Sequence, residues 1–210
     1  MGMASKVLWR CWYRRLERRA PEVGESGVEY ARRLLAAGGW EYSIEKTWEG
    51  GGRCIRSQRR LLLPPRAWDR GLDGVLAAAH EAGHALLDGG LFASGCVSGV
   101  VPAVVAVVWL AAVLAAGWLG IPALAFVAVG VSLLLVGDML VCEVRTCLFA
   151  RDAVQRDFPD PACRAWAQLQ TRAEVWHMVL MAVALSLLFV SAAAVFYALG
   201  AGRVVWNGLA

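Results

Sequence analysis

Hydrophobic and charged positions divide the chain into a polar front part and an apolar back part. No charged side chain occurs in the 49 residues from position 89 to position 137, and a second such stretch, His177 apart, runs from 175 to 202. A helix needs about 20 apolar residues to cross the roughly 30 Å hydrocarbon core of a bilayer. The first stretch is long enough for two crossings, and Gly120 and Pro122 interrupt it. The pattern predicts three transmembrane helices, at about 99–119, 121–141 and 175–199.

Composition agrees with a membrane protein and excludes other classes. Hydrophobic residues make up 59% of the chain and charged residues 18%, against roughly 45–50% and about 25% in soluble domains. Intrinsic disorder and a collagen-like chain are excluded. The six cysteines form no Cys-x-x-Cys pair, which argues against a disulfide framework or a thiolate zinc site.

The distribution of charge predicts an orientation. The first 70 residues hold 15 Lys and Arg against 8 Asp and Glu, and five more Arg lie between 142 and 174. Because cytoplasmic segments carry the excess of Lys and Arg, we expect the N-terminus and 142–174 in the cytoplasm and the C-terminus outside, in the inner or plasma membrane.

The first 27 residues form a basic segment with an amphipathic pattern, and we expect no secretory signal there. Leu8, Trp12 and Leu16 recur four residues apart, with arginines between them. This is typical of a helix on an anionic membrane surface, and a solvated helix docked on the protein gives the same pattern. No nucleic-acid partner is expected, because no recognisable binding module accompanies the charge.

Residues 28–98 read as a small α+β region. We expect a short helix over 31–37, a strand over 40–48, and returning strand pieces at 53–56 and 60–63. The edge of such a sheet can accept an extended peptide as an added strand. The glycines at 50–52 are equally consistent with a simple flexible loop tip.

The chemistry-bearing motif is His80-Glu81-Ala82-Gly83-His84, which fits His-Glu-x-x-His. On a helix the two histidines lie on one face and can bind one zinc ion, with Glu81 beside it as the base that takes a proton from the attacking water. We expect Asp73 as the N-cap of this helix and Gly89-Gly90 as its end.

Catalytic zinc sites usually have a third protein ligand, and Glu143 is our candidate. It lies just past the second predicted span, and the transmembrane hairpin returns the chain to the face that it left. Asp138 is the runner-up. Asp88 and Asp138 are also candidates to hydrogen-bond a ligand imidazole. His177, at the start of the last span, is a candidate donor to the oxyanion of the tetrahedral intermediate, although a Trp-His pair is also an ordinary interfacial anchor.

These features predict a mainly α membrane protein with three transmembrane helices and a small cytoplasmic α+β, zincin-like region. We divide it into a basic N-terminal segment (1–27), the α+β region (28–98) and a transmembrane hairpin (99–141). A cytoplasmic helical segment with the third ligand (142–174), a last transmembrane helix (175–200) and a tail (201–210) follow.

The order of these motifs resembles the YugP-type membrane zinc metallopeptidases. The shared features are Ala31-Arg32-Arg33-Leu34-Leu35, a strand pair, His-Glu-x-Gly-His-Ala at 80–85, two spans, Val141-Cys142-Glu143-Val144 and a last span. The resemblance covers roughly 28–200 and implies zinc bound by His80, His84 and Glu143. The chain departs from the family pattern at 52–57 and at Arg145-Thr146-Cys147. HtpX-type proteases share the plan, but their usual Glu-x-x-Ala-Asp is absent here. FtsH also uses His-Glu-Ala-Gly-His, but this chain carries no ATPase phosphate-binding loop.

Three functions follow as hypotheses. The first is a membrane-anchored zinc endopeptidase that cleaves peptide or protein substrates at the cytoplasmic membrane surface. The second is an intramembrane, site-2-type protease with Asp138 as the metal ligand. The third is a non-catalytic zinc-binding adaptor or sensor in the lipid bilayer.

Overall fold

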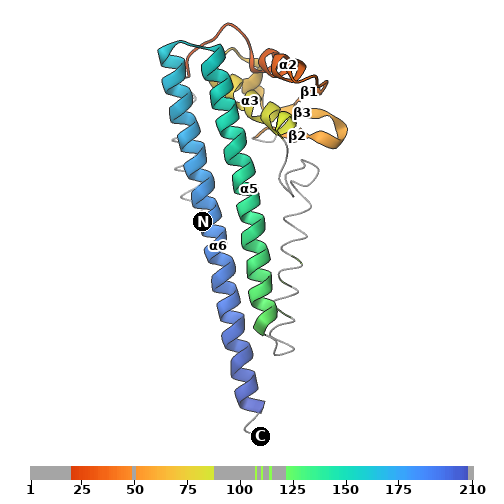
Figure 1. Cartoon of the computed structure of the whole chain (residues 1–210), viewed down its shortest axis with the longest axis vertical. Helices are drawn as coiled ribbons and strands as arrows, with labels where there is room; N and C mark the ends of the chain where they lie inside the picture. The colour runs from red at the N-terminus through yellow and green to blue at the C-terminus, as the bar shows by residue number, and fades with distance from the viewer. Residues whose placement is uncertain are drawn as a thin grey trace.

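The molecule consists of two long neighbouring helices with a small α/β unit packed against one end of them (Figure 1). The computed structural model describes residues 20–48, 51–87, 107, 110, 114 and 122–207. Helix α5 (Pro122–Asp157) leads up to the α/β unit, and α6 (Pro161–Asn207) returns beside it after a short turn. The described part of the chain is thus mostly helical with a small sheet, as the sequence predicts.

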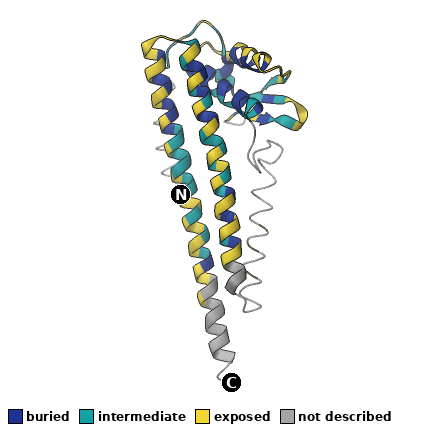
Figure 2. Ribbon diagram, in the orientation of Figure 1, coloured by how far each residue is buried: buried dark blue, intermediate teal, exposed yellow. Residues whose placement is uncertain are grey.

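Two helices are long and apolar enough to cross a membrane, over Phe126–Asp157 and Pro161–Val195. Many large apolar residues in their lower parts are exposed, and yellow alternates there with teal and blue in Figure 2. The first stretch contains 126–141 of the second predicted span, and the second contains 175–195 of the third. The first predicted span, 99–119, and the amphipathic pattern at 8–16 lie largely or wholly outside the described residues.

Neither long helix breaks at the predicted domain boundaries. Helix α5 continues through position 141 and carries Glu143, and α6 begins well before position 175. The segment 142–174 is therefore the upper ends of two helices joined by a turn. Helical hydrogen bonding continues because 141–157 contains no Gly or Pro to interrupt it.

The α/β unit begins with α2 (Gly27–Ala37), which is four residues longer at its N-terminus than predicted. The backbone N–H of Glu29 donates to the hydroxyl of Ser26, and the Glu29 carboxylate accepts from the backbone N–H of Ser26. This capping box satisfies two donors at the helix start. It also holds the pKa of Glu29 below its ordinary value, first through the backbone hydrogen bond of Ser26.

The three strands are β1 (Ser43–Lys46), β2 (Arg53–Ile55) and β3 (Arg60–Leu63), with β3 in the centre. Strand β2 pairs antiparallel with β3, whereas β1 pairs parallel with it. Strand β1 is shorter than the predicted 40–48. Leu61 and Leu63 alternate toward the core and are fully buried, which fixes which face of the sheet meets the helices.

Helix α3 (Leu72–Leu86) carries the His-Glu-x-x-His motif, as predicted. Two details of the prediction are wrong. The N-cap is Gly71, and Asp73 lies inside the first turn, where its charge faces the free N–H groups. The helix ends at Leu86, before the glycines at 89–90, and Arg56 binds the carbonyl groups at this end.

A single core joins the α/β unit to the long helices. Buried residues of α2, α3 and the sheet continue into Ala150, Ala153 and Val154 of α5 and Ala167 of α6. At the rim, Asp157 accepts hydrogen bonds from Tyr30 (3.1 Å) and Arg33 (3.0 Å). Helix α3 therefore packs on a core that includes the upper part of α5.

Candidate metal centre

Helices α3 and α5 bring together three side chains that can bind one ion. His80 and His84 lie one turn apart on α3, and Glu143 reaches them from α5. Among the His, Cys, Asp and Glu side chains of the described residues, these three have ligand atoms that lie close enough together to hold one metal ion. The sequence predicted these three residues, and the structure brings them together.

The spacing of the three ligand atoms fits one small cation. Nε2 of His80 lies 3.1 Å from Nε2 of His84 and 3.2 Å from Oε2 of Glu143, and the third separation is 3.5 Å. Ligands about 2.0–2.2 Å from a shared tetrahedral ion lie roughly 3.3–3.6 Å apart. Two neutral imidazoles and one carboxylate suit a divalent metal such as zinc.

Protons compete for the same site. Burial lowers the pKa of His80, but hydrogen bonds to Cys147 and Glu143 outweigh this effect and raise the pKa well above 6.5. A metal ion must displace that proton from Nε2 before it can bind. Metal uptake is therefore expected to release protons and to weaken in acid.

Glu81 is buried next to the ligands, with 8% of its surface exposed. Its carboxylate accepts a hydrogen bond from the backbone N–H of Cys54 in the middle of β2. A Cβ atom at Gly52 would lie 2.6 Å from Oε1 of Glu81, so any larger residue there would displace the Glu81 side chain. Burial raises the pKa of Glu81, and the nearby histidines oppose the shift. A carboxylate with a raised pKa is suited to take and return a proton.

The other ring nitrogens of both histidines contact α5. Nδ1 of His84 lies 3.4 Å from Oγ1 of Thr146, and Nδ1 of His80 lies 3.5 Å from Sγ of Cys147. Such contacts fix the orientation and tautomer of a metal-binding imidazole. Sequence reasoning missed these two residues, although their spacing from Glu143 was a usable signal: positions i+3 and i+4 share one helix face. They also lie where the chain departs from the YugP-type pattern.

A pocket of about 270 Å³ opens beside the ligands. His80 and Glu81 line one side, and Glu174, His177 and Met178 of α6 line another. Arg66, Gly52 and Ala77 complete its wall. The structure thus brings His177, a predicted site residue, to the same pocket as the predicted base.

Two contacts hold α3 in place over the site. Arg56 donates through Nε to the carbonyl of His84 at 2.6 Å and through Nη2 to the carbonyl of Leu87. A positive charge at the C-terminus of a helix also interacts favourably with the negative end of the helix dipole. Gly83 lets α3 approach α5 closely, because a Cβ atom there would lie 2.9 Å from both Thr146 Cγ2 and Phe149 Cδ1.

The remaining predicted site residues do not join the ligand group. Asp138 is half-buried on α5, five residues before Glu143, and is not a member of that group. Asp88 lies outside the described residues. Among the described residues, Cys54, Cys142, Cys147 and Cys163 are free thiols.

Comparison with known proteins adds no assignment. No family model matches the chain, and neither the curated proteins nor the solved structures include a significant match.

Proposed function

We propose that this protein is a membrane-anchored, zinc-dependent endopeptidase. The observation that carries the proposal is the meeting of His80 and His84 of α3 with Glu143 of α5, beside a buried Glu81. Two histidines and a glutamate are a common ligand set of catalytic zinc, which leaves one position open for water or substrate. The resemblance to YugP-type metallopeptidases implies the same ligands and the same base.

The roles of the chain's own groups follow from their positions. Glu81 accepts a proton from the attacking water and returns it to the leaving amine, which its raised pKa favours. His177 lines the same pocket and donates a hydrogen bond to the carbonyl oxygen as negative charge develops there. Bound zinc would supply Lewis-acid polarisation of the scissile carbonyl and of the water.

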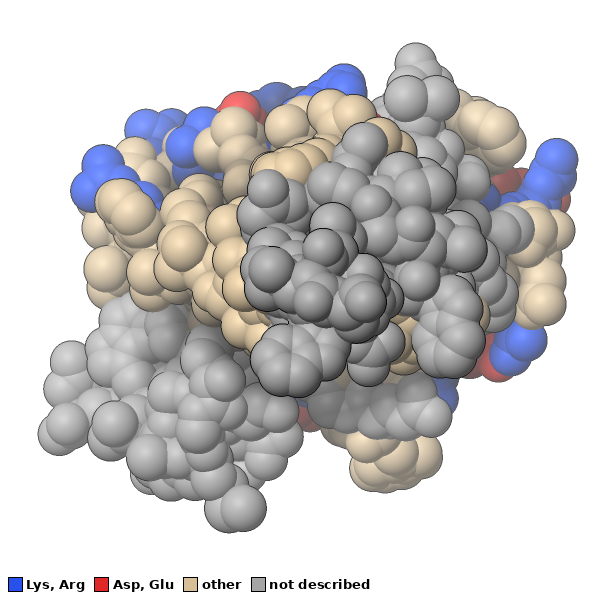
Figure 3. All heavy atoms as spheres, turned by 90° about the horizontal axis from the view of Figure 1, so that it is seen from below, with Lys and Arg blue, Asp and Glu red and all other residues tan. Residues whose placement is uncertain are grey.

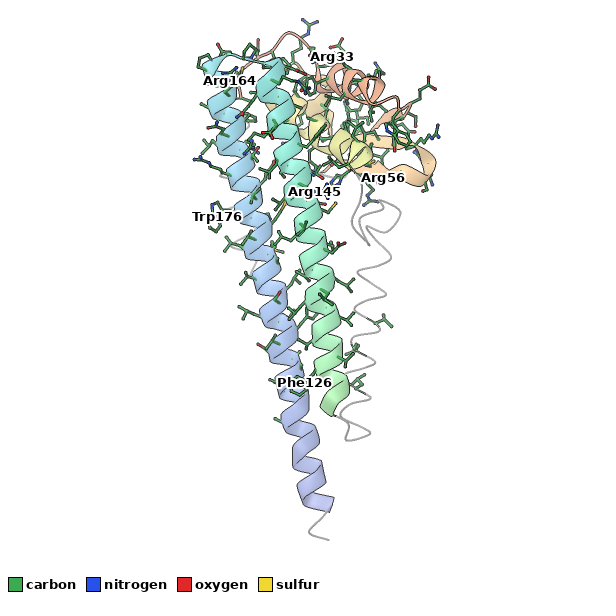
Figure 4. All side chains as sticks on the ribbon, viewed as in Figure 1. Arg33, Arg56, Phe126, Arg145, Arg164 and Trp176 are labelled. Atoms are coloured by element: carbon green, nitrogen blue, oxygen red, sulfur yellow. The ribbon has the colours of Figure 1, made fainter. Side chains whose placement is uncertain are left out.

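The pocket lies at the level where the long helices become apolar. Arg56, Arg145 and the 65% exposed Trp176 lie at similar heights in Figure 4, whereas Phe126 lies far below on α5. Figure 3, seen from the lower end, has Lys, Arg, Asp and Glu at the rim of the outline. Tryptophan and arginine are enriched at membrane–water interfaces. We therefore infer that cleavage occurs at the membrane surface, on the cytoplasmic side, with the apolar stretch at 99–119 as a third span.

Hydrolysis of an unstructured protein such as casein, by full-length protein loaded with Zn²⁺, tests this proposal. Glu81→Gln is expected to lower the rate by about 10²–10⁴-fold, which is the usual contribution of a general base, while the bound zinc stays unchanged. Glu45→Gln is the matched control, because Glu45 pairs with Arg60 on the exposed sheet.

The outcomes separate the alternatives. A Glu81→Gln variant as active as the wild type contradicts the mechanism. A wild-type protein that binds zinc but cleaves no substrate indicates the non-catalytic adaptor instead.

A further inference from the structure

The support of His80 continues beyond its immediate neighbour into helix α6. The Sγ atom of Cys147 lies 3.5 Å from Nδ1 of His80, and its S–H donates to Oε2 of Glu174 at 3.7 Å. The other carboxylate oxygen of Glu174 accepts a hydrogen bond from Nε2 of Gln170 at 3.2 Å. His80, Cys147, Glu174 and Gln170 thus form one line of polar contacts, which we call the thiol relay.

We propose that Glu174, acting through the thiol of Cys147, is a positioning residue for His80 and sets the metal affinity of the site. This inference rests on the proposed zinc site but not on peptide hydrolysis. A histidine that binds a metal through Nε2 carries its proton on Nδ1, and a nearby acceptor must hold that proton. Here the acceptor is the sulfur of Cys147.

A thiol alone is a weak acceptor. Its S–H bond is polarised when it donates to a carboxylate, because hydrogen bonds in a chain strengthen one another. Glu174 therefore makes the sulfur a better partner for the imidazole than an isolated cysteine would be. Cys147 is 1% exposed and Gln170 2%, so water competes little at these two side chains. Glu174 is half-buried and also lines the pocket beside the ligands.

The second histidine has a different support. Thr146 faces Nδ1 of His84, and its hydroxyl donates to the carbonyl of Cys142 one turn earlier on the same helix. The support of His84 ends within α5, whereas the thiol relay reaches α6. Through the thiol relay, the position of α6 is linked to His80.

Zn²⁺ affinity of the full-length protein, measured by competition with a chromophoric chelator, tests the thiol relay. Cys147→Ala and Glu174→Gln are each expected to weaken Zn²⁺ binding about 10-fold, within the 10–100-fold range typical of such partners. The double variant should lose no more Zn²⁺ affinity than the single variant that binds Zn²⁺ more weakly, because the two groups act as one unit. Cys147→Ser keeps a donor and acceptor and is expected to stay within about fivefold of the wild type.

Cys163→Ala is the matched control, since Cys163 is another buried cysteine outside the ligand group. It should bind Zn²⁺ as the wild type does. Circular dichroism of all the metal-free variants should match the wild type, which separates a lost contact from a lost fold.

The inference is overturned if Glu174→Gln binds Zn²⁺ like the wild type, or if the losses of the two single variants multiply in the double variant. A wild-type protein that binds no Zn²⁺ overturns both this inference and the proposed site. A protein that binds Zn²⁺ and shows the expected losses, but cleaves nothing, contradicts only the peptidase proposal.

Discussion

Oε2 of Glu143 lies 3.2 Å from Nε2 of His80, although the two residues belong to different helices, which the stretch 87–121 separates along the chain. No local sequence motif predicts this contact, because it forms only when α5 packs on α3. It identifies Glu143, rather than Asp138, as the carboxylate that meets the two histidines.

Metal content is the first test of this relationship. Glu143→Ala removes one of three ligands and is expected to lower Zn²⁺ affinity by more than about 100-fold. The ion would then keep only two protein ligands. Asp138→Ala, on the same helix, is the matched control and should retain zinc. Inductively coupled plasma mass spectrometry of dialysed protein measures both. The reverse pattern would support the intramembrane arrangement with Asp138 as ligand.

Gly83 provides the second test, because it controls the approach of α3 to α5. In Gly83→Ala the new methyl group meets Phe149 and Thr146 at 2.9 Å. Overpacking of this kind costs about 1–3 kcal/mol, and the separation of the helices should also weaken Zn²⁺ binding. Gly24→Ala is the control, because a Cβ atom there has no neighbour within 4 Å. Equal thermal unfolding of the two variants would show that the helices tolerate the added methyl group.

Arg56 offers a third test, at the end of the metal-motif helix. Arg56→Met keeps the apolar stem and removes the hydrogen bonds to the carbonyls of His84 and Leu87. Hydrogen bonds from a charged group contribute about 1.5–3 kcal/mol, so we expect a lower free energy of unfolding by about 2 kcal/mol. Arg53→Met, an exposed position on β2, is the control. Chemical denaturation that leaves the two variants equal would contradict a capping role.

The fourth test concerns pH. Burial raises the pKa of Asp73 above its ordinary 3.8, against the opposing effect of Arg66. A raised pKa in the folded state means that ionisation favours unfolding. The stabilising contribution of the protonated carboxyl is complete below 3.8 and is lost as pH rises through the folded-state pKa.

Asp73→Asn removes this titration while its amide oxygen can still accept the backbone N–H of Gly74. We expect a higher melting temperature than the wild type at pH 7, and a difference that shrinks as the pH approaches 3.8. Glu41→Gln, an exposed position outside the helix, controls for the loss of one negative charge. A difference that is constant with pH would show that ionisation of Asp73 is not its cause.

The sequence predicted the parts of the site that depend on local periodicity. Spacing of i and i+4 placed His80 and His84 on one face, and the apolar stretches predicted both long helices. The roles of Thr146 and Cys147 were missed because they depend on which face of α5 meets α3. Periodicity places both residues on the same face as Glu143, but it does not show that this face meets α3, which depends on the close approach at Gly83. The parallel pairing of β1 with β3 was missed for the same reason, since strand order depends on long-range packing.

Helix α5 runs without interruption from the apolar stretch to the metal ligand. Ala128, Ser132 and Leu135 are buried in its lower part, and Thr146 and Cys147 are buried above. Each residue turns an α-helix by about 100°. An insertion of one residue between these levels would rotate the lower face away from its partner or turn Glu143 away from the histidines. Length variation in this helix is therefore expected in steps of about seven residues, which restore two full turns, and the thickness of membrane that the protein matches changes in the same steps.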